Sequence, residues 1–432
     1  MSITQEAFCT MDQAGHKWFP EARFGMFIHW GLYSLAGGSW KGMHVPWVSE
    51  WLMRKCKVPI REYETLTKEF NPVDFNADEW VRAARDAGMK YMVVTAKHHD
   101  GFCMYKTAYD SYNIVDATAF GRDPMKELAE SCRKYGVKLG FYYSQDQDWH
   151  EKGATGNTWD FAESDQNPEA FQAYLERKVK PQVRELLTNY GEICILWFDT
   201  PHQITEEQSA DLKEFVHSLQ KDCLVSGRVG NGKGDYESLG DNQLPPTVPE
   251  RLCEGLGTMN ESWGYKSMDL HYKSSKEILR TLCRMAGKST NYLLNVGPDG
   301  SGNFPVQSKE ILRDCGAFLA KYGEGLYGTQ ALKRIQCFEF RWGDVVWKGS
   351  TLYFWIFDPS QEVHFYGLRN KVKKVTHLGE DIPFSTDHDE KMDYHRLSMD
   401  LPAAGLPEIC VVAVEFEGDL SYNEASYGSA DF

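Results

Sequence analysis

The amino-acid sequence predicts an α/β fold, a (β/α)8-like TIM barrel followed by a small C-terminal antiparallel β-sandwich. Its 432 residues exceed the usual size of one domain, about 100 to 200 residues. From residue 24 to about 330, short apolar runs alternate with helical patterns, which is typical of parallel strands joined by helices. After about residue 337 only short β-type runs follow, separated by turn residues. We therefore expect a barrel over 1–336 and a sandwich over 337–432.

Seven barrel strands are predicted, each an apolar run that ends in a polar, aromatic or glycine-bearing loop. They cover residues 23–31, 91–102, 137–146, 193–199, 223–229, 252–259 and 291–298. Helices with apolar residues at three- and four-residue spacing are expected at 78–88, 123–136, 168–190, 204–221, 274–287 and 306–322. In the sandwich, 338–358 and 406–418 read as strands. A doubly wound open sheet is the alternative, but no GxGxxG turn follows any strand.

Composition excludes several classes of partner. The formal net charge is −15 and the Lys and Arg residues are scattered among carboxylates, which argues against nucleic acid. No run reaches the roughly 18 apolar residues of a membrane span, and the first residues show no basic region followed by an apolar stretch. The eleven cysteines fall singly, without a CxxC pair, which favours reduced thiols over a disulfide or metal framework. We expect a cytoplasmic protein without a membrane partner.

Polar side chains stand where the predicted strands end. They are His29, His98, His99, Tyr143, Asp199 and Arg228. The carboxyl ends of barrel strands converge on one face, so these groups are expected to share a site. Simple alternation would turn only one ring of the pair His98 and His99 toward the barrel axis.

Each of these residues also has a purely structural interpretation. The histidines could be core residues, and Asp199 could cap the next helix with Pro201 at its first position. However, a carboxylate beside Trp197 and Phe198 is costly to ionise unless donors surround it, which suits a nucleophile toward an anomeric carbon. Thirteen tryptophans, several near His and Glu in loops, suit a sugar ring that stacks on indole.

Seven motifs follow one another along residues 18 to 330: "FGMFIHWGLYS", "SEWL", "AKHHDGF", "YYSQDQDW", "ILWFD", "ESWGY" and "NYLLNVGPDGSGNFP". In this order they resemble the motifs of the α-L-fucosidases, glycoside hydrolase family 29. The resemblance implies a C-terminal β-sandwich, no cofactor, and a retaining double displacement in which Asp199 attacks C1 of fucose. It further implies that the sugar is held by His29, Glu50, Trp51, His98, His99, Tyr143, Trp197 and Arg228, with Trp263 against the fucose methyl group.

The acid/base residue lies on a loop that varies within that family. The resemblance places Asp241 there, in "GDYESLGDNQLPPTVPERLCE", with Glu237 and Glu254 as rivals. Glu254 matches a family glutamate usually preceded by Trp, whereas this chain has Cys253. A second carboxyl about 5 Å from the nucleophile is what a retaining glycosidase requires.

Three functions follow as hypotheses. The first is an exo-acting α-L-fucosidase that acts on a small fucosylated oligosaccharide or glycoconjugate. The second is a metal-dependent barrel hydrolase with Zn²⁺ at His29, His98, His99 and Asp199, although adjacent histidines seldom ligate one ion. The third is a catalytically silent sugar-binding homologue. The sequence leaves open the fucosyl linkage, the acceptance of L-galactose and the oligomeric state, with a homo-oligomer as one option.

Overall fold

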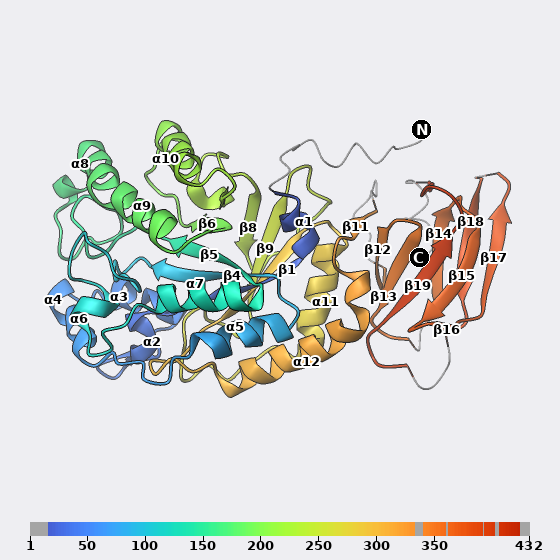
Figure 1. The fold of residues 1–432 in the computed structure, drawn as a ribbon, viewed down its shortest axis with the longest axis horizontal. Helices are drawn as coiled ribbons and strands as arrows, with labels where there is room; N and C mark the ends of the chain where they lie inside the picture. Colours follow the sequence, from blue (N-terminus) through green and yellow to red (C-terminus); the bar gives the residue numbers. More distant parts are fainter. Residues whose placement is uncertain (1–15, 333–339, 360–361, 392, 402–405, 424–432) are drawn as a thin grey trace.

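The barrel sheet contains eight strands that all run parallel. The computed structural model describes residues 16–332, 340–359, 362–391, 393–401 and 406–423. Within them the strands pair in the order β7-β6-β5-β4-β1-β10-β9-β8, and the sheet curls into an open barrel with helices outside it (Figure 1). The strands are β1 (Phe24–Ile28), β4 (Tyr91–Lys97), β5 (Lys138–Tyr143), β6 (Ile195–Phe198), β7 (Leu224–Val225), β8 (Glu237–Asp241), β9 (Cys253–Thr258) and β10 (Asn291–Val296).

The two end strands, β7 and β8, approach each other without forming a ladder. The Asp235 amide donates to the carbonyl of Val225 at 2.8 Å, and the Gly227 amide donates to Oγ of Ser238 at 3.2 Å. A β-carbon on Gly227 would lie 2.8 Å from the carbonyl oxygen of Tyr236, so this close approach requires glycine. These two hydrogen bonds connect the two edges of the sheet at the open side of the barrel.

All seven predicted barrel strands are present, but the sequence prediction missed β8. Its residues, "ESLGD", carry a carboxylate at each end and a glycine near the middle, and every one of them is at least partly exposed. β8 pairs with β9, so a fully buried neighbour holds it in the sheet. Strand formation here depends on that pairing and not on an apolar run.

The predicted barrel helices are all present, and most begin at a side-chain cap. Asn76, Asp123, Thr205 and Ser274 each accept a backbone N–H at the start of their helix. These helices are α5 (Ala77–Asp86), α7 (Pro124–Tyr135), α10 (Glu206–Leu219), α11 (Ser275–Ala286) and α12 (Val306–Tyr322). The predicted helix 168–190 is α8 (Pro168–Tyr174) and α9 (Lys180–Asn189), joined by the π-helical turn η6 (Leu175–Val179).

Short elements lie in the loops at the carboxyl ends of the strands, before the first strand and directly after α12. They are α1 (Trp18–Ala22), α2 (Leu32–Ala36), β2 (Ser39–Trp40), β3 (Met43–His44), η3 (Ser49–Trp51), α3 (Leu52–Lys55), α4 (Ile60–Tyr63), η4 (Glu64–Lys68), α6 (Ile114–Ala117), η5 (Glu163–Asp165), η7 (Gly227–Val229) and η8 (Gly323–Gly325). The segment from β2 to α3 matters most, because η3 brings Glu50 and Trp51 to the site described below.

The C-terminal region forms two antiparallel sheets beside α11 and α12, as predicted (Figure 1). One has the order β11-β12-β13-β19-β15-β16 and the other β14-β18-β17. Their strands are β11 (Gln330–Ala331), β12 (Gly343–Lys348), β13 (Thr351–Ile356), β14 (Val363–Leu368), β15 (Val372–His377), β16 (Glu380–Asp381), β17 (Phe384–Asp389), β18 (Tyr394–Met399) and β19 (Cys410–Phe416). The predicted boundary at 336 and 337 lies outside the described residues, and β11 already pairs with β12.

Aromatic side chains fill the inside of the barrel beneath its carboxyl-terminal mouth. Phe27, Tyr142 and Trp197, from β1, β5 and β6, are buried together in a core cluster separate from the one under the outer helices. The rings of Tyr142 and Trp197 stack with centroids 5.7 Å apart. These rigid rings form a floor on which polar side chains from the strand ends are placed.

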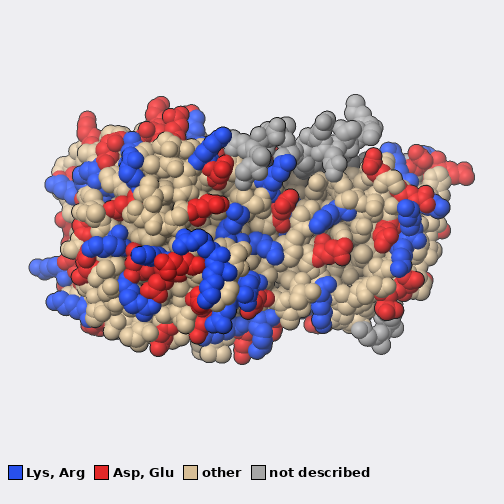
Figure 2. All heavy atoms as spheres, viewed as in Figure 1, with Lys and Arg blue, Asp and Glu red and all other residues tan. Residues whose placement is uncertain are grey.

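The outer surface shows mixed charge. On the face in Figure 2, acidic and basic side chains are interspersed and form no basic stripe. Among the helices of the described residues, none is long and apolar enough to cross a membrane.

Candidate active site

A pocket opens at the carboxyl ends of the barrel strands, where the sequence predicted the site. Its walls contain every predicted site residue except Tyr143 and Glu254. The lining residues are Phe27, His29, Trp47, Val48, Glu50, Trp51, His98, His99, Tyr142, Trp197, Asp199, Thr200, Arg228, Asp241, Leu256 and Trp263. Glu50 and Trp51 come from the short helix η3, Asp241 from β8 and Trp263 from the loop after β9, so the pocket is assembled from segments far apart in the sequence.

Asp199 follows the last residue of β6 and is held on every side. Its Oδ1 accepts from Nη1 of Arg228 at 2.9 Å, its Oδ2 accepts from the Tyr142 hydroxyl at 2.8 Å, and its backbone N–H donates to Oε1 of Gln145 at 2.9 Å. Burial alone would raise the pKa of this carboxyl, but Arg228, His99 and Tyr142 together hold it below its ordinary value. The side chain is therefore ionised at neutral pH, as a nucleophile must be.

The alternative interpretation of Asp199 as a helix cap is wrong. Helix α10 begins at Glu206, and Thr205 caps it, with its side chain accepting from the N–H of Gln208. Asp199 lies six positions before this cap. Thr200 adopts a positive φ of 49°, which turns the chain sharply after the carboxylate and leaves Asp199 facing the pocket.

The predicted sugar-binding tyrosine, Tyr143, points the wrong way, and Tyr142 takes its place. Neighbouring residues of a strand face opposite sides of the sheet, so only one of the two can enter the barrel. Tyr142 lines the pocket, whereas the Tyr143 hydroxyl donates to Oε1 of Gln182 on α9, at 2.7 Å, outside the barrel. The sequence prediction chose the wrong one of two adjacent tyrosines, because "GFYYS" does not indicate which of the two rings faces the inside of the barrel.

Both His98 and His99 line the pocket, contrary to the expectation from alternation. The pairing of β4 with β5 shifts between Thr95 and Lys97, and the strand ends at Lys97. A register shift of this kind redirects the following side chains, a common device beside active sites. The two rings lie 4.2 Å apart, centroid to centroid, and both face the site.

The histidines of the pocket are neutral. Burial lowers the pKa of His29 and of His99 to about 4, and it lowers that of His98 as well. Nδ1 of His29 lies 2.7 Å from Oδ1 of Asn295, whose amide group donates to the carbonyl of Trp263 at 2.7 Å. Since Oδ1 can only accept, Nδ1 carries the proton and Nε2 of His29 is left as an acceptor. Asn295 was missed at the sequence level, although it lies within the quoted motif "NYLLNVGP".

Glu50 enters the site from the short helix η3 and is locked to the loop after β9. Its Oε2 accepts from the N–H of Gly264 at 2.8 Å, next to Trp263. A β-carbon on Gly264 would lie 2.8 Å from the ring of Tyr33, so the loop can approach this closely only with glycine. Burial raises the pKa of Glu50 to about 7, and the backbone hydrogen bond opposes that rise. This carboxyl is poised to bind hydroxyl groups.

Arg228 connects the two predicted catalytic carboxylates. Its Nη1 donates to Asp199, and its Nη2 donates to Oδ1 of Asp241 at 2.5 Å. The guanidinium also lies 5.1 Å from the ring centroid of Trp197. One planar guanidinium therefore bridges the two carboxylates and brings both to the same side of the pocket.

The rivals of Asp241 do not reach the pocket. Glu254 is fully buried beneath its floor, where it accepts hydrogen bonds from Tyr91, Trp197 and Tyr236 at 2.6, 2.8 and 3.1 Å. Burial raises the pKa of Glu254, and these donors oppose the rise. Glu237 begins β8 and Asp241 ends it, so the parallel direction of that strand places Glu237 away from the mouth. Among the three, only Asp241 lines the pocket.

Gln145 is a second residue that the sequence prediction missed. It is fully buried in the loop after β5, where its Oε1 accepts from the amide of Asp199 and its Nε2 donates to the carbonyl of Arg228 at 3.0 Å. One side chain thus ties the ends of three neighbouring strands together. The motif "YYSQDQDW" contains it, but the residue type alone gave no sign of this role.

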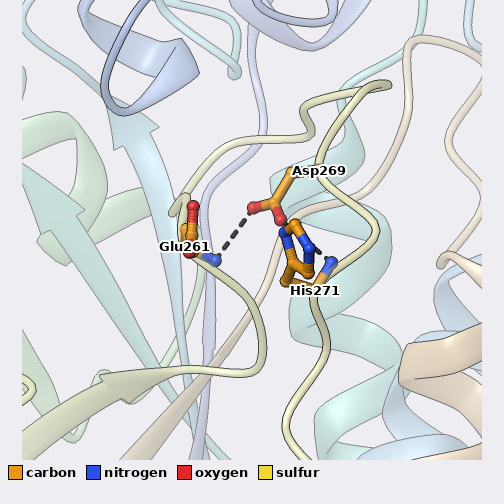
Figure 3. Close-up of side chains that lie close together, drawn as sticks. All are labelled: Glu261, Asp269 and His271. Carbon is orange, nitrogen blue, oxygen red and sulfur yellow. Dashed lines mark hydrogen bonds between the residues drawn. The ribbon is translucent and has the colours of Figure 1, made fainter.

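The predicted zinc ligands do not form a group with metal-binding geometry. Among the described residues, the one group of His, Cys, Asp or Glu side chains with ligand atoms within 4.8 Å of one another is Glu261, Asp269 and His271, shown in Figure 3. In that group, Asp269 already accepts from the backbone N–H of Glu261 at 2.8 Å and of His271 at 3.3 Å. Its carboxylate closes the loop that carries Trp263.

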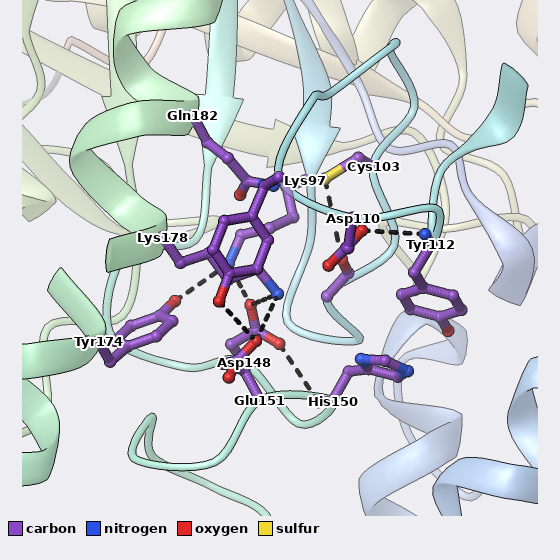
Figure 4. Close-up of polar contacts among 12 residues, drawn as sticks. Lys97, Cys103, Asp110, Tyr112, Asp148, His150, Glu151, Tyr174, Lys178 and Gln182 are labelled. Carbon is purple, nitrogen blue, oxygen red and sulfur yellow. Dashed lines mark hydrogen bonds and ion pairs between the residues drawn. The ribbon is translucent and has the colours of Figure 1, made fainter. Parts of the chain in front are cut away.

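A buried ionic network, drawn in Figure 4, includes Lys97, the residue that precedes His98 in the chain. Asp148 accepts from Nζ of Lys97 at 2.7 Å and lies 3.0 Å from Nζ of Lys178, and none of the three side chains is exposed. The two lysines lower the pKa of Asp148 despite its burial. Lys178 comes from the π-helical turn η6, and the next residue after Asp148, Trp149, donates its N–H to the carbonyl of His99 at 2.7 Å.

The chain is similar to known proteins in both sequence and structure. The sequence profile described as Alpha-L-fucosidase matches residues 4–324. Plasma alpha-L-fucosidase of Rattus norvegicus is 30% identical over 334 residues, 72% of this chain and 70% of that protein. The alpha-L-fucosidase of Vibrio sp. strain EJY3 superposes with a TM-score of 0.89 at 32% identity, covering 95% of this chain and 74% of that one.

The alpha-L-fucosidase AlfC of Lactobacillus casei, solved in complex with its alpha-L-fucose product, is 41% identical. It superposes with a TM-score of 0.68 and covers 72% of this chain and all of that one, 100%. A variant of AlfC has been solved with Fuca(1,6)GlcNAc. Profile, sequence and structure agree, and this chain belongs to the α-L-fucosidase family of glycoside hydrolases.

Proposed function

We propose that the protein is an exo-acting α-L-fucosidase that releases terminal fucose with retention of configuration. The observation that carries the proposal is Asp199, an ionised carboxylate at the end of β6 that Arg228 and Tyr142 hold toward the pocket. A pocket closed below by Trp197, with Leu256 among its walls, suits one terminal sugar better than an internal unit of a chain. The substrate class is a fucosylated oligosaccharide or glycoconjugate, as the AlfC complexes suggest.

In the first step, a carboxylate oxygen of Asp199 attacks C1 of the bound fucose. The bond from C1 to the leaving-group oxygen breaks as Asp241 donates its proton to that oxygen, and a fucosyl ester of Asp199 remains. Asp241 suits this role because it lines the pocket and its side chain is 46% exposed, so protons can exchange with solvent.

In the second step, Asp241 takes a proton from a water molecule, whose oxygen attacks C1 and releases Asp199. Two inversions at C1 restore the α configuration. The neutral histidines and Glu50 bind the fucose hydroxyls as acceptors and donors, and Trp263 packs against the apolar side of the sugar. Arg228 stays in contact with Asp199 throughout, so the carboxylate that is regenerated meets a cation.

The stereochemical test is proton NMR of the first product formed from 4-nitrophenyl α-L-fucoside. Appearance of the α anomer before mutarotation supports retention, whereas the β anomer first would refute it. Absence of turnover on every α-L-fucoside, with fucose binding intact, would favour the silent sugar-binding alternative.

Azide distinguishes the two carboxylate roles. Asp199→Gly with azide should give the β-fucosyl azide, because azide replaces the nucleophile on the β face. Asp241→Gly with azide should give the α-fucosyl azide, because azide then attacks the ester intermediate in place of water. Glu254→Gly serves as the matched control. Rescue at Glu254 together with failure at Asp241 would assign the acid/base role to Glu254.

A further inference from the structure

The pocket has a mouth defined by two exposed side chains. Among the residues that line it, only Trp47 and Asp241 are exposed, while the others are buried or half-buried. Trp47 is 51% exposed, whereas Trp197 and Trp263 are 1% and 7% exposed. The side of the pocket that is open to solvent therefore lies beside these two residues.

Trp47 is fixed in place although its indole ring is open to solvent. Its ring centroid lies 5.6 Å from that of Trp51, and Nζ of Lys55 lies 5.0 Å from the Trp47 ring. The carbonyl of Trp47 accepts from Nζ of Lys266, in the loop that carries Trp263, at 2.8 Å. An indole held on both its ring and its backbone loses little conformational freedom when a ligand covers it.

We propose that Trp47 is the binding platform for the leaving-group sugar, a pyranose attached to fucose. This inference rests on the proposed function, because Asp241 must protonate the glycosidic oxygen and the leaving group must therefore sit beside Asp241, at the mouth. Trp47 is the aromatic ring there that keeps a solvent-facing surface. The apolar C–H face of a pyranose stacks on such a ring, while its hydroxyls reach the neighbouring lysines.

The test compares two substrates that share fucose and differ in the leaving group. α-L-Fucosyl fluoride presents no sugar to Trp47, whereas a fucosyl disaccharide does. The disaccharide is the best hydrolysed of a panel with α1,2, α1,3, α1,4 and α1,6 linkages to GlcNAc or galactose. The measured quantity is kcat/KM for the disaccharide divided by kcat/KM for the fluoride, for the full chain.

Trp47→Ala should lower this ratio about 10-fold or more, because a half-exposed indole loses its stacking and its apolar contact. Trp47→Phe should restore most of it. Met43→Ala, which trims another exposed apolar side chain on the same segment, 52% exposed and outside the pocket, should leave the ratio at the wild-type value.

An unchanged ratio in Trp47→Ala, or an equal fall of the ratio in Met43→Ala, would overturn the proposal that Trp47 is a binding platform. Hydrolysis of the fluoride without hydrolysis of any disaccharide would overturn it as well, since no leaving-group sugar would then be accepted. Failure of the wild-type protein on the fluoride itself would remove the proposed function, and the platform with it.

Discussion

Tyr142 offers the sharpest test of how the proposed nucleophile, Asp199, is held ionised. Its hydroxyl donates to Oδ2 of Asp199 at 2.8 Å, and its ring stacks on Trp197 and on His98, with centroids 5.7 and 5.4 Å apart. Tyr142→Phe removes the one hydrogen bond and keeps both stacking contacts. After the substitution, Oδ2 has Nε2 of the neutral His99 at 3.7 Å as its remaining polar neighbour among these contacts.

The size of the effect follows from the type of bond that is lost. A hydrogen bond to a charged group contributes about 1.5 to 3 kcal/mol, and each 1.36 kcal/mol corresponds to about one pKa unit. Because the bond stabilises the ionised form of Asp199, its loss should raise the pKa of that carboxyl by about one to two units. Arg228 still holds the other oxygen, so Asp199 remains ionised at neutral pH.

The assay is kcat/KM for 4-nitrophenyl α-L-fucoside as a function of pH, which reports ionisations of the free enzyme. The acid limb should move to higher pH by about one to two units in Tyr142→Phe. Tyr143→Phe is the matched control, since it removes the neighbouring hydroxyl, whose bond goes to Gln182. It should leave the acid limb in place.

Two results would refute this reasoning. An unmoved acid limb in Tyr142→Phe would mean that the hydroxyl does not stabilise the ionised nucleophile. An equal movement in both variants would mean that the limb reports a general loosening of β5 and not the contact with Asp199. The thermal unfolding midpoints of both variants are measured with the activity, because a general loosening of β5 would lower both midpoints, whereas loss of the single contact with Asp199 would not.

Three further outcomes are expected. Gln145→Leu should lower kcat about 10-fold to 100-fold with a smaller change in KM, because Asp199 is displaced. Gln145→Glu should recover part of kcat, because it keeps an oxygen that accepts from the Asp199 amide. A change confined to KM in Gln145→Leu would contradict this prediction. Because burial raises the pKa of Glu50 from 4.5 to about 7, its protonated form stabilises the fold most below pH 4.5, and that contribution is lost as pH rises to about 7. The unfolding free energy of the wild type should thus fall relative to Glu50→Gln by on the order of 3 kcal/mol across this window in urea titrations, and parallel curves would contradict it. Lys178→Met should cost about 3 to 5 kcal/mol in the same titrations, because Asp148 loses a buried cation. The control Lys371→Met, which removes an ion pair from a side chain that is 76% exposed, should cost about 1 kcal/mol or less. Equal costs would show that the buried pair adds nothing.

Much of the fold was predictable because its signals are local. A barrel strand buried on both faces needs a continuous apolar run, and "ILWF" of β6 is such a run. Capped helices such as α11 are also predictable from local sequence, because Ser274 and Glu277 form a capping box at its start. β8 has no such signal, since its residues are partly exposed and it is a strand only because β9 pairs with it.

The site was predictable where residue type decides the chemistry. His29, Glu50, Asp199 and Arg228 stand at the ends of strands or in motifs that resemble those of the family, and all four line the pocket. Gln145 and Asn295 were missed because an amide acquires its role only from the groups it meets. Their partners lie 54 and 266 positions away in the chain.

The sequence by itself determined the family, the order of the elements and the position of Asp199 after β6. Only the tertiary structure decided that Tyr142 faces the pocket, that His98 and His99 both do, and that Asp241 lines the mouth while Glu254 is buried. The physical reason is that a β-strand offers two faces, and its phase is set by the register and irregularities of its pairing with neighbours. Composition and motifs indicate which catalytic and binding side chains the chain contains, whereas the strand pairing determines which of these side chains face the same pocket.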